Sequence, residues 1–272
     1  LLGGITNKNF LVGDRGRKYV VRTGGDILVH GIVRTTELAA TRAAHAAGIT
    51  PAVIHAEHGI MVLDFIDGQT FKPEDVRNPN NLDRLVDLIR HCHRDVALHL
   101  RGPAPIFWPF HVIRDYAHTL RDGSSPYVPQ LGELLARSAR LEAAVGPIDV
   151  VFSHNDLLAA NILDDGDRLW LIDWDYAGFN SPLFDVGGLA SNSEMPQDLA
   201  DNLLAAYFGR PVDGALARQA AAMTAASLLR EAMWAMVSEI HSTVDFDYAA
   251  YTAENLARFE AAWARLTILE TS

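Results

Sequence analysis

Two short apolar runs, each ending in polar residues of a fixed pattern, place the strongest limit on how this chain can fold. The first run, residues 150–152, leads into a loop with the pattern His-x-Asp-x4-Asn, which is formed by His154, Asp156 and Asn161. The second run ends at Asp173. Apolar runs of this length, bounded by polar residues, are typical of short buried strands. The sequence therefore predicts that two carboxylates and one amide gather around a pair of strand ends.

These residue types match the needs of phosphoryl transfer from ATP. An acceptor hydroxyl is a poor nucleophile unless a base takes its proton, and Mg²⁺ on the triphosphate prefers hard oxygen ligands. Asp156 is the candidate catalytic base. Asn161 and Asp173 are the candidate metal ligands, in the order and spacing that kinases use. A simple turn residue is the alternative for Asp156, but the flanking apolar runs favour catalysis.

We expect two neighbouring residues, His154 and Asp175, to have supporting roles. We expect His154 to hydrogen-bond the loop backbone, because Asp156 already fills the role of base. Asp175 is a weaker metal candidate that is expected to face away from Asp173, and a surface salt bridge is an equal alternative for it.

The N-terminal residues carry a candidate nucleotide site. Glycines in residues 3–10 allow the backbone to approach phosphate, and Thr6 and Asn7 add side-chain donors; a plain hairpin turn is the alternative. Arg22 lies on an apolar strand and can fork onto phosphate. We expect Glu37, near the start of the next helix, to hold Arg22 by an ion pair. Matching of the helix dipole is the alternative for Glu37.

Net charge and composition limit the partners. The formal charge of −11 argues against nucleic acid and suits a cationic acceptor, although solubility alone is an equal explanation. Because the chain has only three lysines, a phosphate clamp must use arginine, backbone N–H groups or metal. No run approaches the roughly 20 apolar residues of a membrane span, and Cys92 is the only cysteine. We therefore expect a cytoplasmic protein.

The pattern along the chain predicts an α+β fold with two lobes. Residues 1–65 read as a small antiparallel sheet with one helix, which forms the nucleotide-binding lobe. Residues 66–272 read as a mainly helical lobe that carries the catalytic loop and the acceptor pocket. The expected helices cover residues 37–47, 82–100, 110–121, 128–144, 184–191, 196–208, 213–241 and 246–267.

Together these segments resemble the choline/ethanolamine kinase group of the aminoglycoside phosphotransferase-like superfamily. Residues 3–10 are similar to its nucleotide loop, and residues 152–163 and 171–187 to its catalytic and metal motifs. The resemblance implies a bilobal protein-kinase-like fold, ATP and Mg²⁺, and a catalytic role for Asp156. We place the adenine against the strand end at Leu63 and Phe65. Asp185 resembles a family residue that braces the catalytic loop by hydrogen bonds.

The C-terminal helices resemble the family's amine pocket, in which aromatic faces hold an ammonium group. Trp234 and Tyr251 match two of its aromatic residues, with plain core packing as the alternative. Glu231 stands where the family has a further Trp. A carboxylate there can pair with a primary ammonium or with a neighbour such as Arg230.

The resemblance therefore implies that the acceptor is a small cationic amino alcohol of the choline or ethanolamine type. An aminoglycoside or another hydroxylated metabolite is the alternative, and a catalytically silent nucleotide-binding module is a third possibility. The sequence leaves open the oligomeric state, the choice between ATP and GTP, and whether residues precede Leu1.

Overall fold

The computed structural model describes residues 7–271, which form two compact units. The first unit contains the described residues up to Ile106 together with Val150–Phe208. The second contains Phe107–Asp149 and the residues from Gly209 onward. The described residues up to Phe65 thus share a unit with the loop of Asp156. The expected division after Phe65 into two lobes stays a prediction.

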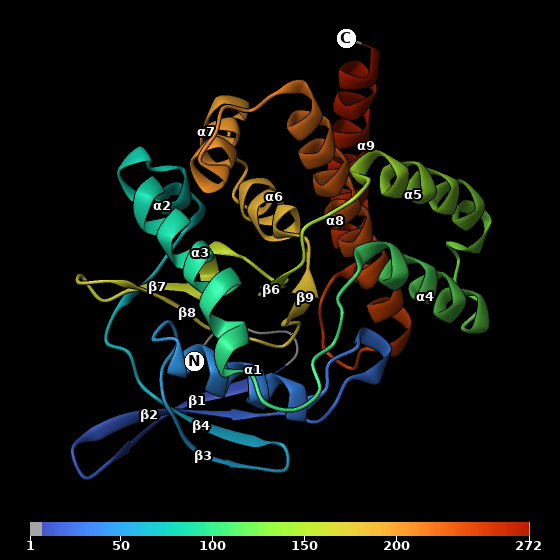
Figure 1. Cartoon of the computed structure of the whole chain (residues 1–272). Coiled ribbons are helices and arrows are strands. Elements are labelled where there is room, and N and C mark those ends of the chain that lie inside the picture. Colours follow the sequence, from blue (N-terminus) through green and yellow to red (C-terminus); the bar gives the residue numbers. More distant parts are fainter. Residues whose placement is uncertain (1–6, 272) are drawn as a thin grey trace. The chain divides into compact units, whose positions relative to one another are not determined.

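A four-stranded antiparallel sheet, in the order β1-β2-β4-β3, opens the first unit (Figure 1). Its strands are β1 (Lys8–Asp14), β2 (Arg17–Thr23), β3 (Val53–Glu57) and β4 (Ile60–Asp64). Arg15 and Gly16 join β1 to β2 with φ angles of 48° and 79°, the left-handed pair that a two-residue hairpin turn requires. Gly59, with φ = 73°, likewise lies in the turn that joins β3 to β4.

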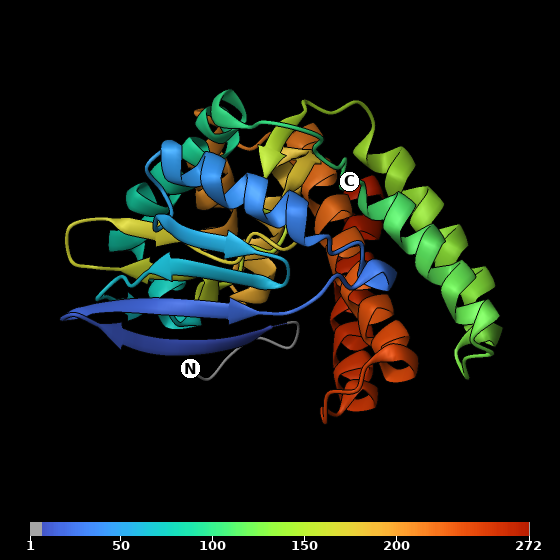
Figure 2. The same cartoon turned by 90° about the horizontal axis from the view of Figure 1, so that it is seen from below.

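Helix α1 (Arg34–Ala46) packs against β3 and against helix α3 (Leu82–His99) (Figure 2). Its alanines make close approach possible, since Ala40, Ala43 and Ala44 are all buried. Helix α3 buries residues at helical spacing, as its sequence predicts. Both helices agree with the expected ranges to within a few residues at each end.

Short strands surround the catalytic motif. Strand β6 (Val151–Ser153) pairs with β9 (Gly178–Asn180), and β7 (Ile162–Asp164) lies between β5 (Gln69–Thr70) and β8 (Leu169–Leu171). Gly68 is needed for the approach of β5, because a Cβ atom there would lie 2.7 Å from the Asp164 carbonyl oxygen. Helices complete the unit: α2 (Pro73–Arg77), α6 (Pro182–Asn192) and α7 (Gln197–Phe208).

The second unit is helical throughout its described elements. It consists of α4 (Pro109–Asp122), α5 (Leu131–Val145), α8 (Gly214–His241) and α9 (Tyr248–Thr271). Helix α8 is buried on most of its surface, because α4, α5 and α9 all pack against it. A helix surrounded in this way needs small and apolar residues on nearly every side, which the alanine-rich sequence of α8 provides. Among the helices of residues 7–271, none is both long and apolar enough to cross a bilayer.

Candidate active site

The loop that follows β6 carries Asp156, and hydrogen bonds join it to Asn161 and to the residue that precedes Asp173. The side-chain nitrogen of Asn161 donates to the carbonyl oxygen of Asp156 at 2.9 Å and lies 3.5 Å from Asp156 Oδ2. The backbone N–H of Ile172 donates to the carbonyl oxygen of Asn161 at 2.9 Å. Since Ile172 immediately precedes Asp173, all three predicted residues lie in one small region of the first unit.

His154 fastens this loop to the chain before Asp173. Its Nε2 lies 2.9 Å from the carbonyl oxygen of Ile172, so Nε2 carries the proton and donates. The ring is buried beside Trp174, with 4.9 Å between the ring centroids. Burial holds the pKa of His154 below its usual value. His154 is therefore a neutral support that hydrogen-bonds a backbone carbonyl, and that carbonyl belongs to Ile172 rather than to the loop expected from the sequence.

Asp185, on α6, anchors the two residues that precede Asp156. Its Oδ2 accepts from the backbone N–H of His154 and its Oδ1 from that of Asn155, both at 2.8 Å. Burial alone would raise the pKa of Asp185, but hydrogen bonds from His93 and His154 hold it below the ordinary value. The expected bracing of the loop by Asp185 is confirmed.

Asn155 adopts a backbone conformation that few residues other than glycine take, with φ = 64°. Asparagine tolerates this region better than most residues. Its side chain is also fixed, because Nδ2 donates to the carbonyl oxygens of Tyr176 at 2.9 Å and Gly178 at 3.2 Å, and Oδ1 accepts from Asn180 at 2.8 Å. The surroundings thus hold a strained backbone in place directly before Asp156.

A buried ion cluster lies where β2, α1 and the chain after β8 meet. Arg22 Nη2 lies 2.9 Å from Asp173 Oδ1, 3.0 Å from Asp175 Oδ1 and 3.2 Å from Glu37 Oε1. Burial opposes the charge on Arg22, but the carboxylates, Asp173 first among them, raise its pKa above the usual value. The predicted ion pair between Arg22 and Glu37 is present.

Arg34 is a member of this cluster that the sequence analysis missed. Its Nη1 donates to Glu37 Oε2 and to Asp175 Oδ1, both at 2.7 Å, and its Nε donates to the carbonyl oxygen of Gly25 at 2.8 Å. Burial raises the pKa of Glu37 to about 7, against the opposing effect of Arg22. The spacing of Arg34 and Glu37, three residues apart at the start of α1, is the signal that could have revealed the pair.

The expectation for Asp175 is wrong. Its side chain is buried and accepts from the same Arg22 that holds Asp173, so the two carboxylates converge. Asp173 itself has φ = 69°, which turns the chain out of the strand direction just before Asp175. Asn7 Nδ2 also donates to Asp175 Oδ2 at 3.0 Å. The other predicted residue of that loop, Thr6, lies outside the described residues.

A pocket lies beside the ion cluster. Its polar lining includes four residues of the cluster region, Asn7, Arg22, Arg34 and Glu37, together with Glu57. Its apolar lining includes Leu38, Ala56, Ile60 and Met61. Phe65 lies outside this lining. Phe65 is half-buried, with Lys18 Nζ 5.1 Å from its ring centroid. Its predicted contact with adenine stays a prediction.

The oxygen atoms near Asp156 fit a magnesium ion. The Asn161 amide nitrogen donates to the carbonyl oxygen of Asp156. Asn161 Oδ1 is therefore the atom of this side chain that can bind a cation. The Asp173 side chain is about one-fifth exposed, although one of its oxygens contacts Arg22. An amide oxygen and a carboxylate form the kind of partial ligand set that Mg²⁺ takes from proteins.

In the second unit, the two aromatic residues that we expect to bind the acceptor lie in one aromatic cluster. The rings of Trp234 and Tyr251 lie edge to face at 6.3 Å. Phe246 and Tyr248, which the sequence analysis did not assign to the site, join them at centroid distances of 5.0 to 6.0 Å. Their position just before and at the start of α9, close to Tyr251 in the sequence, is the signal that could have indicated them.

Glu231 is engaged by two neighbours within this cluster. Its Oε1 accepts from the Tyr251 hydroxyl at 3.0 Å, and its Oε2 accepts from the guanidinium of Arg230. Burial, together with the Glu231 charge, raises the pKa of Tyr251 above its ordinary value. Of the two alternatives for Glu231, pairing with Arg230 is the one that the structure shows, and a role in binding substrate stays a prediction.

Known proteins with related sequences and folds are kinases. The family model described as choline/ethanolamine kinase matches residues 1–201. Protein LicA of Haemophilus influenzae is 28% identical over 212 residues, which cover 76% of this chain and 61% of LicA. Ethanolamine kinase 2 of mouse is 27% identical over 299 residues, covering 98% of this chain and 76% of the relative.

A solved structure extends the likeness to the fold. The crystal structure of a choline/ethanolamine kinase family protein from Mesorhizobium loti is 28% identical to this chain. The superposition covers 100% of this chain and 92% of that one, with a TM-score of 0.81. The predicted α+β, protein-kinase-like fold is confirmed.

Proposed function

This chain belongs to the choline/ethanolamine kinase family, and we propose that it transfers the γ-phosphoryl group of ATP to the hydroxyl of a small amino alcohol. The acceptor is of the choline or ethanolamine type. One observation carries the proposal: hydrogen bonds join Asp156, Asn161 and the residue before Asp173 in one small region of the first unit. We also propose a cytoplasmic location, which the composition leads us to expect.

Asp156 is the proposed base. It is half-buried and sits on a backbone fixed by Asp185 and by the Asn155 side chain. Its carboxylate would orient the acceptor hydroxyl and take its proton as the phosphorus–oxygen bond forms. Because phosphoryl transfer depends mainly on positioning and electrostatics, a rigid loop is the main contribution that this chain makes.

Asn161 and Asp173 would hold Mg²⁺. Bound there, the metal supplies positive charge that offsets the charge of the phosphates. Arg22 lies next to Asp173 and would fork onto phosphate oxygens from the same side. Glu37 keeps the guanidinium of Arg22 in place by an ion pair.

The nucleotide is proposed to bind to the sheet of the first unit. Thr6 and Asn7 would contribute donors to phosphate, and Phe65 an apolar face for adenine. Asn7 supports this role through its hydrogen bond to Asp175 in the ion cluster, which brings the start of β1 to the metal ligands.

The ammonium group of the acceptor is proposed to contact the aromatic cluster of the second unit. Trp234 and Tyr251 offer ring faces, each able to attract a cation by about 0.5–2 kcal/mol. Glu231, already paired with Arg230 and Tyr251, would act mainly by fixing the Tyr251 ring.

A product screen tests the proposal. The full chain is incubated with γ-labelled ATP, Mg²⁺ and one of four acceptors: choline, ethanolamine, homoserine or kanamycin. We expect label in choline phosphate or ethanolamine phosphate. Label in kanamycin alone would establish the aminoglycoside alternative, and no Mg²⁺-dependent transfer to any acceptor would establish a silent module.

A further inference from the structure

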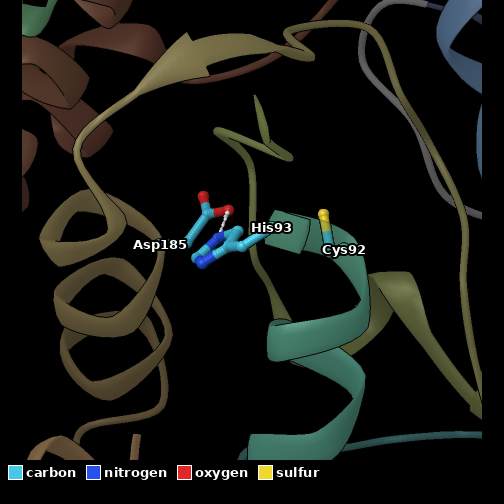
Figure 3. Close-up of side chains that lie close together, drawn as sticks. All are labelled: Cys92, His93 and Asp185. Atoms are coloured by element: carbon cyan, nitrogen blue, oxygen red, sulfur yellow. Dashed lines mark hydrogen bonds and ion pairs between the residues drawn. The ribbon is translucent and has the colours of Figure 1, made fainter. Parts of the chain in front are cut away.

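A buried polar network lies behind the loop of Asp156 and reaches α3, α6 and α7. Asp185 is its centre, since one carboxylate accepts from both loop amides and also contacts the His93 ring. Figure 3 shows the contact between Asp185 and His93. His93 Nε2 lies 2.9 Å from Asp185 Oδ2, and both side chains are 1% exposed. The mechanism above uses Asp185 but gives no role to His93.

His93 is held at both ring nitrogens. A carboxylate only accepts hydrogen bonds, so Nε2 carries the proton and donates to Asp185. Nδ1 lies 2.7 Å from the Tyr207 hydroxyl. Burial, with the Asp185 charge, raises the pKa of Tyr207 to about 12, so this hydroxyl keeps its proton and can donate to Nδ1 of a neutral ring. Hydrogen bonds thus link Tyr207 through His93 to Asp185.

The far end of this chain of hydrogen bonds is itself fixed. Arg90, one turn before His93 on α3, donates to the carbonyl oxygen of Ala206 at 2.6 Å and to that of Tyr207 at 2.7 Å. These are carbonyls of the last turn of α7, which have no partner within the helix. Arg90 therefore holds Tyr207 at the position from which its hydroxyl reaches His93.

A metal site is a weaker explanation for the same residues. The ligand atoms of Cys92, His93 and Asp185 lie within 4.8 Å of one another. However, both His93 nitrogens and both Asp185 oxygens already make hydrogen bonds. Burial also raises the pKa of Cys92 well above its usual value, whereas a metal requires the thiolate.

We propose that His93 and Tyr207 are positioning residues for phosphoryl transfer: through Asp185 they fix the backbone of His154 and Asn155 and thus the direction of Asp156. The proposal deepens the proposed function and rests on it. His93 is too deeply buried to touch a substrate and acts only through Asp185. A misplacement of a catalytic group by about 1 Å costs about 100-fold in rate, which is the scale of effect that such a support controls.

Four variants of the full chain test this. His93→Leu removes the donor to Asp185, and His93→Gln restores an N–H near the position of Nε2. Tyr207→Phe removes only the hydroxyl. Cys92→Ala is the matched control, because it alters packing in the same turn of α3 without removing a hydrogen bond to Asp185.

The first readout is steady-state kinetics with ATP and the best acceptor of the screen. We expect His93→Leu to lower kcat by about 10- to 100-fold with KM values within about threefold of the parent. His93→Gln should recover most of that loss, Tyr207→Phe should lower kcat by about 3- to 10-fold, and Cys92→Ala should leave it unchanged. If His93→Leu fails to fold, an unchanged kcat in Tyr207→Phe overturns the proposal. So does an equal loss in Cys92→Ala.

The second readout is independent of activity, so that failure of the proposed function is distinguishable. Amide hydrogen exchange of residues 154 and 155 is compared between the parent and Tyr207→Phe. We expect faster exchange in the variant at these two amides, and no change for Cys92→Ala. Unchanged exchange in both variants would overturn the positioning role, whereas inactivity of the parent on every acceptor would overturn only the proposed function.

Discussion

Two buried polar clusters in the first unit support the candidate site in different ways. Around Asp185, one carboxylate meets two backbone N–H groups and an imidazole at 2.8 to 2.9 Å. Around Arg22, two arginines meet three carboxylates at 2.7 to 3.2 Å. The first cluster is a hydrogen-bonded support centred on one carboxylate, and the second is an ionic assembly in which acidic side chains outnumber basic ones.

The two clusters differ in role: one fixes the loop of Asp156, and the other contains the candidate metal ligand Asp173. Asp185 accepts from two backbone N–H groups, so this cluster fixes the main chain of the loop that carries Asp156. The Arg22 cluster shares its carboxylates among several cations, and Asp173 belongs to it while also being about one-fifth exposed. An excess of acid at that position favours the entry of a further cation, which agrees with a metal role for Asp173.

The largest expected effect comes from removing the group that the Asp185 cluster holds. Asp156→Ala should lower kcat by about 10³- to 10⁴-fold, because the acceptor hydroxyl loses its base. ATP affinity, measured by calorimetry, should stay within about threefold of the parent, because binding and chemistry involve different groups. Full turnover in this variant would refute the assignment of Asp156.

The next largest effect is the loss of unfolding free energy on removing a buried arginine, compared with removing an exposed one. Arg34→Met leaves two buried carboxylates short of a partner and should lower the free energy of unfolding by about 3–5 kcal/mol. Arg17→Met is the control, since Arg17 pairs with Asp64 at the surface and should contribute about 0–1 kcal/mol. Urea denaturation of both variants measures the difference. Equal losses of unfolding free energy in the two variants would show that the buried cluster contributes no more to stability than a surface ion pair.

The pH dependence of stability tests the other cluster. The pKa of Asp185 is lowered in the folded protein, so its ionised form stabilises the fold above the unfolded pKa of about 3.9. That contribution is lost as the pH falls through the lower, folded pKa. Replacement by Asn removes the ionised acceptor and should cost about 2–3 kcal/mol at pH 7.

Thermal unfolding between pH 7 and pH 2 provides the measurement. The gap between the parent and Asp185→Asn should be widest near pH 7 and should narrow below about pH 4. Asp83→Asn, at an exposed position on α3, should track the parent throughout. A gap for Asp185→Asn that is constant with pH would show that ionisation of Asp185 contributes nothing.

The smallest expected effect concerns the second unit. Trp234→Leu should raise the KM of the acceptor by about 2- to 30-fold, the equivalent of one cation–π contact, with the KM for ATP unchanged. Trp263→Leu is the matched control, because Trp263 lies on α9 and stacks with Arg137 and Arg140 instead. An equal rise in both variants would assign Trp234 to packing alone.

Local chemistry made much of this molecule predictable. The β1–β2 hairpin follows from a turn at Arg15 and Gly16, and the helices follow from apolar spacing with Gly and Pro at their ends. The ion pair of Arg22 and Glu37 follows from a cation on a strand followed by an acid in the next helix. Each of these depends on residues that are close in sequence or on one well-defined motif.

Contacts between distant segments were not predictable in the same way. Arg34 and Asp175 are 141 residues apart, and no local pattern links them. Asp175 was placed wrongly because a strand was expected to continue through Asp173, whose left-handed backbone redirects the chain. The role of His93 could not be predicted for the same reason as that of Arg34, since its partners are distant in the sequence: Asp185 on α6 and Tyr207 on α7.

The single thiol of this chain sits at a useful place. Cys92 is buried beside His93, and burial raises its pKa, so iodoacetamide would react with it only when α3 transiently opens. Because opening free energies range from near zero to the global value in different segments, the alkylation rate under native conditions would report how often the catalytic support comes apart. No engineered label is needed for that experiment.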